Sequence, residues 1–156
     1  MLSYRVRARY AEPVNERIRN IAVGLIVRGE HVLAEEYPAS DRHPRFLRAI
    51  GGGIDFGETA EEALRREFQE ELDVEVGEVE QLAVTENHFT LAGRRGHEIV
   101  HVFAIHCAAL EGMPLDERRA NGDSRSIVGW YRLDELGDDK LPFYPHGILE
   151  IACGLA

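Results

Sequence analysis

The sequence predicts an α/β fold built on a mixed β-sheet with helices packed on its faces. Apolar and β-branched runs alternate with two helical patterns, in the order strands, helix, strands, helix. The 156 residues are 44% hydrophobic and 29% charged, which suits one sizeable core rather than two. No internal repeat or low-complexity tract divides the chain. We therefore expect a single domain over residues 1–156, with residues 1–19 as an extended N-terminal segment.

The first strands are expected to form a hairpin. Residues 21–28 are rich in Val and Ile, and a short turn at 29–30 leads into a second strand over 31–37. Residues 38–44 begin and end with proline and are expected to form a loop. The following segment, residues 46–53, ends in three consecutive glycines.

A helix is predicted over residues 59–72. Thr59 is a favourable N-cap, and Glu62 three residues later completes a capping box. Apolar residues recur at every fourth position from Leu64 and form a stripe along the helix. One side of this helix is therefore expected to pack on the core, while the neighbouring side faces a cleft.

The second half of the chain contains three further predicted strands. Residues 79–89 and 98–109 flank a loop that contains Gly-Arg-Arg-Gly at 93–96. A polar stretch at 111–125 separates them from a short strand at 127–132.

The C-terminal region is expected to be helical in two places. Asp134 can cap a brief helical turn, and Pro145 or His146 can open a last helix that ends near Cys153. Cys107 lies in an alternating apolar run. Both cysteines are expected to be reduced packing residues, because two do not make a disulfide framework.

Three carboxylates, Glu67, Glu70 and Glu71, stand at helical spacing in the predicted helix. Residues at i, i+3 and i+4 share one helix face within about 6 Å. Each pair repels by about 2 to 3 kcal/mol at an effective dielectric near 20, so a cation is needed to offset the charge. All-oxygen ligands suit Mg²⁺ or Mn²⁺, which share their remaining positions with waters and substrate phosphates. The alternative is a solvated acidic face without a metal.

Residues 52–74 resemble the Nudix box, G-x5-E-x7-R-E-U-x-E-E-x-G-U, where U is a bulky apolar residue. The matching positions are Gly52, Glu58, Arg66, Glu67, Phe68, Glu70, Glu71 and Val74. Asp73 is the one departure, since the pattern has glycine there. Aspartate tolerates the left-handed conformation better than most residues, so Asp73 is still expected to end the helix.

The resemblance implies a Nudix-type α/β/α sandwich with a mixed sheet. It also implies a metal-dependent hydrolase that cleaves the diphosphate of a nucleoside diphosphate linked to another group X, by attack of water on phosphorus. Mg²⁺ or Mn²⁺ would be the cofactor. The implied catalytic residues are Glu58, Arg66, Glu67, Glu70 and Glu71. Glu67, Glu70 and Glu71 would hold the metal, Glu58 would act nearby or through water, and Arg66 would orient Glu58; the general base is left unassigned.

Other candidates lie outside the box. The carbonyl of Gly51 is a possible metal contact, with a merely tight turn as the alternative. Glu98 is a candidate extra carboxylate for the metal, with an ordinary exposed strand residue as the alternative. The arginines can neutralise phosphates, and Phe89, Tyr37 or Phe46 can stack on a base, although the arginines can equally be solvated and the aromatic residues part of the core. The substrate-binding candidates are Arg48, Phe89, Arg94 and Arg95.

Residues 97–101 match H-E-x-x-H, the signature of zinc metalloproteases. That signature requires a helix, because on a strand the two histidines stand about 13 Å apart and cannot share one zinc ion. The surrounding residues are β-branched and aromatic, which favours a strand. A protease site is therefore not expected.

Charge and hydropathy restrict the partners. A net charge of −10 disfavours a nucleic-acid polymer and favours a small nucleotide substrate that approaches with bound cations. Neither a leader nor an apolar run of membrane-spanning length is evident, so we expect a cytoplasmic protein without membrane contact, as a monomer or homodimer.

The residues bear on two alternative functions and two substrate subclasses. One alternative is a Nudix-fold module that binds or senses a nucleotide without hydrolysing it, although the retained glutamates favour an enzyme. The other is an isomerase of an isoprenoid diphosphate, whose catalytic cysteine has no evident equivalent here. Residues 88–91 lack both the proline typical of ADP-ribose hydrolases and the tyrosine of dinucleoside polyphosphate hydrolases, so neither subclass is supported.

Overall fold

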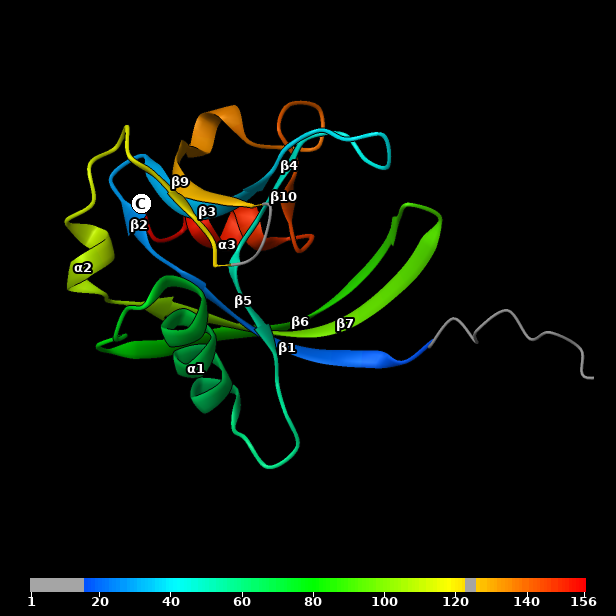
Figure 1. The fold of residues 1–156 in the computed structure, drawn as a ribbon, viewed down its shortest axis with the longest axis horizontal. Helices are drawn as coiled ribbons and strands as arrows, with labels where there is room; N and C mark the ends of the chain where they lie inside the picture. Colours follow the sequence, from blue (N-terminus) through cyan, green and yellow to red (C-terminus); the bar gives the residue numbers. More distant parts are fainter. Residues whose placement is uncertain (1–15, 123–125) are drawn as a thin grey trace, which may run out of the picture.

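The computed structural model describes residues 16–122 and 126–156, and two β-sheets form its middle layer (Figure 1). The first sheet has the order β5-β1-β7-β6, formed by Ile50–Gly53, Ile18–Leu25, Arg94–Ile105 and Val79–Leu91. The second has the order β10-β4-β3-β9-β8, formed by Phe143–Tyr144, Phe46–Arg48, His31–Tyr37, Ile127–Arg132 and Arg118–Ala120. A short strand, β2 (Val27–Arg28), also pairs with β3.

Both sheets are mixed. In the first sheet β1 runs parallel to β7, while the β1–β5 and β6–β7 pairs are antiparallel. In the second sheet β4 and β10 are parallel and the other pairs are antiparallel. The predicted α/β class is confirmed, but the strands divide between two sheets. The division follows from a break at Ile26, which separates β1 in one sheet from β2 in the other.

Helices cover both sides of this layer. They are α1 (Ala60–Leu72), α2 (Ala108–Glu111) and α3 (Ile148–Cys153), with a 3-10 turn at Leu133–Glu135. One buried cluster joins Leu64 and Phe68 of α1 to strand residues such as Phe103. A second cluster joins Ile148 of α3 to Val102. Neighbouring strand residues point to opposite faces, so the strands are buried on both sides, as in an α/β/α sandwich.

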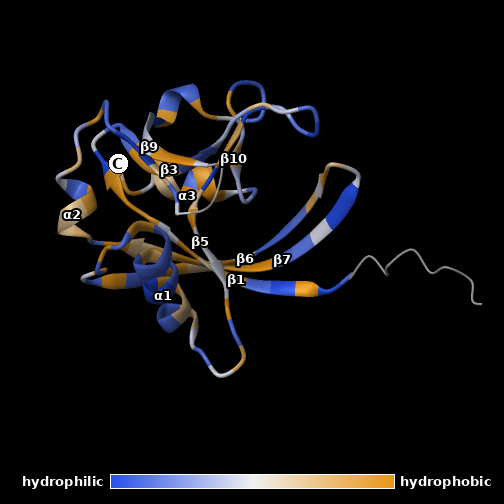
Figure 2. Ribbon diagram, viewed as in Figure 1, coloured by the Kyte–Doolittle hydropathy of each residue, from blue (hydrophilic) through white to orange (hydrophobic). Residues whose placement is uncertain are grey.

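The helix that carries the glutamates begins and ends as its sequence predicts. The Thr59 hydroxyl accepts a hydrogen bond from the N–H of Glu62 at 3.1 Å, and the Glu62 carboxylate accepts one from the N–H of Thr59 at 2.7 Å. Asp73 ends the helix in the left-handed conformation, with φ 52° and ψ 44°, and its N–H donates to the Gln69 carbonyl. Figure 2 shows polar and apolar residues alternating along α1. Asp73 thus performs the capping role for which the pattern uses glycine.

Several predicted boundaries hold and others are wrong. The turn at 29–30, β3 and β9 lie where expected, but the strand expected over 21–28 is divided into β1, which already begins at Ile18, and β2. The expected loop at 93–96 is wrong, because Ala92 and Gly93 alone make the turn with φ of 50° and 77°, so β7 already begins at Arg94. Two positive φ values match the twist of a two-residue hairpin. The expected strand at 98–109 ends early, since α2 begins at Ala108.

The C-terminal predictions also need correction. The helical turn near Asp134 exists, but the Asp134 carboxylate accepts hydrogen bonds from Arg132 at 2.9 and 2.7 Å instead of capping it. The last helix begins after Gly147, whose φ of 84° is incompatible with helix. The strand β8 inside the polar stretch was not predicted, and it exists because it pairs with β9.

The two cysteines differ in environment. Cys107 is free and buried, as predicted, and its N–H donates a hydrogen bond to the Glu111 carboxylate at 3.3 Å. Cys153 is free but exposed, so its predicted packing role is wrong. It lies in the last turn of α3, where Ile148 and Ala152 take the buried positions. In the described ranges, no helix combines the length and apolarity needed to cross a membrane.

Candidate metal and substrate site

Glu67 of α1 lies against strand β5. A Cβ atom added to Gly52 would stand 2.4 Å from Cδ of Glu67, so the Glu67 carboxylate occupies the space above this glycine. The Glu67 side chain is 15% exposed and that of Glu70 is 61% exposed. The exposure of the acidic face therefore increases from the strand toward solvent. Gly52 is therefore required as a cradle for one of the three carboxylates.

Arg66 connects the acidic helix face to the loop before α1. Its guanidinium donates two hydrogen bonds to Glu58, at 2.6 and 2.9 Å, and a third to the Gly53 carbonyl at 2.9 Å. It also pairs with Glu67 at 3.0 Å and Glu70 at 3.3 Å. The Glu58 carboxylate accepts hydrogen bonds from Arg66 and from the N–H of Asp55, and these lower its pKa to about 2. The contact expected between Arg66 and Glu58 is present.

Glu71 has a different environment, which involves a carboxylate that the sequence analysis missed. Asn121 donates from Nδ2 to Glu71 at 3.2 Å and to Glu35 at 2.7 Å. Burial raises the pKa of Glu71 to about 7; the charges of Glu35 and Glu67 add to the rise, while Asn121 and Arg48 oppose it. Glu35 also accepts hydrogen bonds from Tyr37 at 3.0 Å and from Ser126. A carboxyl group with this pKa is partly protonated near pH 7, and a bound cation would favour loss of its proton.

The pKa of Glu71 predicts a pH-dependent stability in metal-free protein. A folded pKa raised from 4.5 to about 7 gives stability that is present below pH 4.5 and lost as pH rises through 7. Allowing for partial solvent screening, the loss is about 1 to 2 kcal/mol. Glu71→Gln stays neutral and avoids this loss. With EDTA present, its melting temperature relative to wild type should rise by about 3 to 6 °C between pH 5 and pH 8; an unchanged difference in calorimetry would contradict the prediction.

Glu98 is buried, so its reading as an ordinary exposed strand residue is wrong. It is 2% exposed and lies on the face of β7 that carries Val100 and Val102. Its carboxylate pairs with Arg48 at 3.3 Å and Arg19 at 3.5 Å, and it accepts a hydrogen bond from Asn87 at 3.2 Å. Two guanidinium groups already compensate its charge. Its role as a metal ligand stays a prediction.

Gly51 lies within β5 rather than in a free turn. Its φ is 148°, and an added Cβ would stand 2.0 Å from the carbonyl oxygen of Ala22 on β1. The close approach of the two strands therefore requires glycine, which accounts for this residue without a metal. A metal contact from its carbonyl stays a prediction.

An open cleft of about 990 Å³ lies beside these residues. Arg48, Phe89 and Arg95 line it, whereas the described lining does not include Arg94. The opposite wall carries the stacked rings of Tyr37 and Phe46, whose centroids are 4.9 Å apart.

The cleft and the acidic face meet at Arg48 and Tyr37. Arg48 donates to Glu98 and its charge opposes the rise in the pKa of Glu71. Tyr37 donates to Glu35, and its pKa is raised to about 12 by burial and by the Glu35 charge. Phe89 packs across Gly96, where an added Cβ would stand 2.2 Å from its ring. Arg95 pairs with Glu16 at 2.8 Å, so the cleft wall contains a preformed ion pair.

The sequence reasoning missed Glu35 and Asn121 as site residues. Glu35 is 4% exposed and follows the buried residues Val32 to Ala34 on β3. A charged residue in an otherwise buried strand is the one signal that points to it. Nothing local marks Asn121, which reaches the site only because β8 and β9 pair.

Comparisons with known proteins agree with this architecture. A family model described as the NUDIX domain matches residues 18–149. The fold is similar to a MutT NUDIX hydrolase from Burkholderia pseudomallei, with a TM-score of 0.61, 24% identity, and coverage of 89% of this chain and 98% of that chain. It is also similar to the ORF135 protein of E. coli, with a TM-score of 0.52, 23% identity, and coverage of 89% and 91%. A mutator MutT protein from Bacillus halodurans gives a TM-score of 0.57, 19% identity, and coverage of 87% and 80%.

Proposed function

Because the chain belongs to the NUDIX domain family, we propose that it is a metal-dependent pyrophosphohydrolase. Its substrate is a nucleoside diphosphate linked to another group X, and water attacks a phosphorus of the diphosphate. The observation that supports the proposal is the network in which Arg66 joins Glu58, Glu67 and Glu70. Glu71, on the same helix, feels the charge of Arg48, which lines the cleft. A hard cation and a phosphate chain can therefore meet at one place.

The donor set fits Mg²⁺ or Mn²⁺. The three α1 carboxylates offer oxygen ligands only, and Arg66 is the cation that pairs with Glu67 and Glu70. Gly52 leaves space for the Glu67 carboxylate, and a side chain at position 52 would fill that space. Asn121 Oδ1 is shielded from solvent and has no hydrogen-bond partner among the described residues, so an acceptor remains for a cation or its water. Magnesium and manganese prefer this oxygen chemistry.

The residues of the chain divide the remaining tasks. A bound divalent ion neutralises charge on the diphosphate and lowers the pKa of water. Arg66 fixes Glu58 and Glu67 in one orientation, and Arg48 presents a guanidinium to the cleft, where phosphate charge accumulates. Glu58 is a weak base, because Arg66 holds its pKa at about 2. Glu58 therefore positions Arg66, and the general base remains to be assigned among the other carboxylates.

We expect residues 1–156 to act as one domain in the cytoplasm, as a monomer or homodimer. The partner is a small nucleotide rather than a nucleic-acid polymer, because a net charge of −10 repels an extended phosphate backbone. Phe89 is the candidate for stacking on the base, and Arg95 and Arg94 are candidates for contacts with phosphate.

A substrate panel tests the proposal. Nucleoside triphosphates, nucleotide sugars, ADP-ribose, dinucleoside polyphosphates and NADH are incubated with the protein and Mg²⁺ or Mn²⁺, and released phosphate or nucleoside monophosphate is measured. At least one compound should be cleaved, and EDTA should abolish cleavage. Binding without cleavage across the panel would favour a nucleotide-sensing module instead.

Metal binding also has a readout that does not depend on the substrate. An ion that binds only the folded protein stabilises it by about 2.7 kcal/mol at a concentration of 100 times Kd. The melting temperature should therefore rise with Mg²⁺ concentration and return to its starting value after EDTA.

A further inference from the structure

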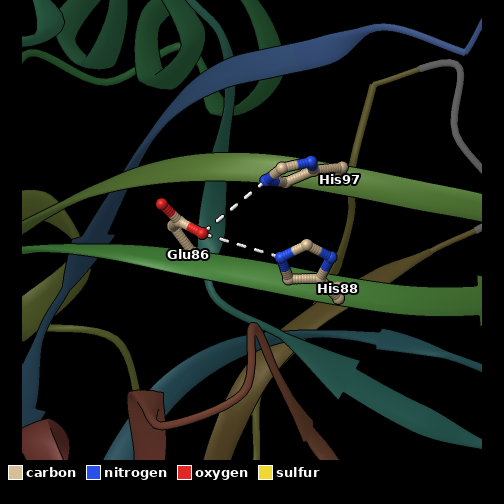
Figure 3. A group of neighbouring side chains, drawn as sticks. All are labelled: Glu86, His88 and His97. Atoms are coloured by element: carbon tan, nitrogen blue, oxygen red, sulfur yellow. Dashed lines mark ion pairs between the residues drawn. The ribbon is translucent and has the colours of Figure 1, made fainter.

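Three side chains with metal-binding groups converge on the β6–β7 hairpin, away from the α1 glutamates. Glu86 and His88 are two residues apart on β6, and His97 stands directly opposite His88 on β7. Figure 3 shows the three side chains gathered on one face of the hairpin, with the carboxylate of Glu86 turned toward both rings. One donor atom from each lies within 4.8 Å of the others. This proximity depends on strand register, because His88 and His97 are cross-strand partners.

The distances are close to those of a zinc site. Nε2 of His88 lies 3.6 Å from Oε2 of Glu86, and Nε2 of His97 lies 3.8 Å from the same oxygen. Tetrahedral zinc with bonds of about 2.0 to 2.1 Å holds its ligand atoms about 3.4 Å apart. The Glu86 oxygen thus needs to approach each of the two histidine nitrogens by only a few tenths of an ångström. The two imidazole rings are now stacked with centroids 4.0 Å apart and must turn slightly to direct both nitrogens to one ion.

A second observation points to a ligand here. Nε2 of His97 is shielded from solvent and has no hydrogen-bond partner within the described part of the chain. A shielded ring nitrogen without a partner costs free energy, which a metal bond would recover. Its nearest acidic neighbour is Glu86, at ion-pair rather than hydrogen-bond distance.

This cluster consists of different residues from the proposed magnesium site. Glu86, His88 and His97 lie on the β6–β7 hairpin, whereas the glutamates proposed to hold magnesium lie on α1. The donor chemistry differs as well, because imidazole nitrogens favour zinc whereas all-carboxylate sites favour magnesium. Within the H-E-x-x-H sequence, His97 lies next to Glu86 and His88 of the neighbouring strand, whereas His101 contacts Gln81.

We infer that Glu86, His88 and His97 bind one Zn²⁺ ion that clamps β6 to β7, with the fourth position open to water. His88 and His97 line the cleft together with Phe89 and Arg95, so the clamp is part of the cleft wall. Zinc therefore fixes the shape of this wall. The inference stands independently of the hydrolase activity.

A zinc titration by calorimetry in excess Mg²⁺ tests this inference, because Mg²⁺ occupies the α1 glutamates. Wild-type protein should bind one equivalent, and His88→Ala and His97→Ala should each weaken binding by more than about 100-fold. His101→Ala is the matched control, since His101 lies on the same face of β7 but pairs with Gln81. The control should bind zinc as wild type does. His88 is 65% exposed, so its replacement leaves the fold intact.

Two further measurements separate this site from the α1 glutamates. Glu67→Gln/Glu71→Gln protein should still bind one zinc equivalent, whatever its hydrolytic activity. Cobalt in place of zinc should give the visible absorption of a tetrahedral site in wild type and lose it in His97→Ala. Equal zinc binding by wild type and both histidine variants, or equal loss in His101→Ala, would overturn the inference.

Discussion

Replacing Glu71 with glutamine is expected to lower the turnover of the cleaved substrate by about 10³-fold. Glutamine keeps the shape and the contact with Asn121 but removes the negative charge that draws in a divalent cation. Losing a group that stabilises charge in the transition state commonly costs 10²- to 10³-fold, and loss of metal adds to this. The expected drop is in kcat at saturating substrate, and it should be only partly restored by raising Mg²⁺.

The control is a glutamate on the same helix that has no place in the site. Glu61 is half exposed and pairs with Arg65 at 2.9 Å, one turn along α1. Glu61→Gln should keep full turnover and the same response to Mg²⁺. Because Glu71→Gln should be folded and, without metal, at least as stable as wild type above pH 7, loss of activity cannot be assigned to unfolding. Unchanged turnover in Glu71→Gln would overturn its assignment as a metal ligand.

The second large effect is expected from a single methyl group at Gly52. In Gly52→Ala the new Cβ would stand 2.4 to 2.6 Å from the carboxylate atoms of Glu67, so that carboxylate must leave its place above β5. Displacing a reacting or metal-holding group by about 1 Å can cost about 10²-fold in rate. We expect a loss of this size in turnover, together with a smaller rise in melting temperature on adding Mg²⁺.

Gly53 provides a neighbouring control. An added Cβ there has Arg19 Nη2 as its nearest neighbour, at 3.9 Å, which is an ordinary contact distance. Gly53→Ala should therefore keep both turnover and the Mg²⁺ response. If the two alanine variants behaved alike, the explanation of Gly52 as a cradle for Glu67 would be wrong.

The helix and the positions of its carboxylates could be predicted from the sequence because they depend on local geometry. The spacing of Glu67, Glu70 and Glu71 places them on one helix face in any fold, and Thr59 and Glu62 cap the helix through contacts three residues apart. The same holds for the strand at residues 97–101, where side-chain type alone argued against a zinc-protease helix.

Other parts of the site depend on strand pairing. Glu98 stays a predicted metal ligand, and its partners Arg19 and Arg48 come from two other strands, so no local pattern indicated them. Glu35 reaches Asn121 because β3, β9 and β8 pair in a particular register. A shift of one residue in any of these pairs would turn the side chains to the other face.

The sequence by itself determined the α/β class, the capped acidic helix and the carboxylate spacing on which the proposed metal site depends, since each depends on residues within a few positions of one another. Only the tertiary structure decided that Glu35 and Asn121 join the site, that Gly52 makes room for Glu67, and that His97 faces His88 instead of His101. These contacts join residues far apart in the chain, and no local pattern fixes the register that brings them together.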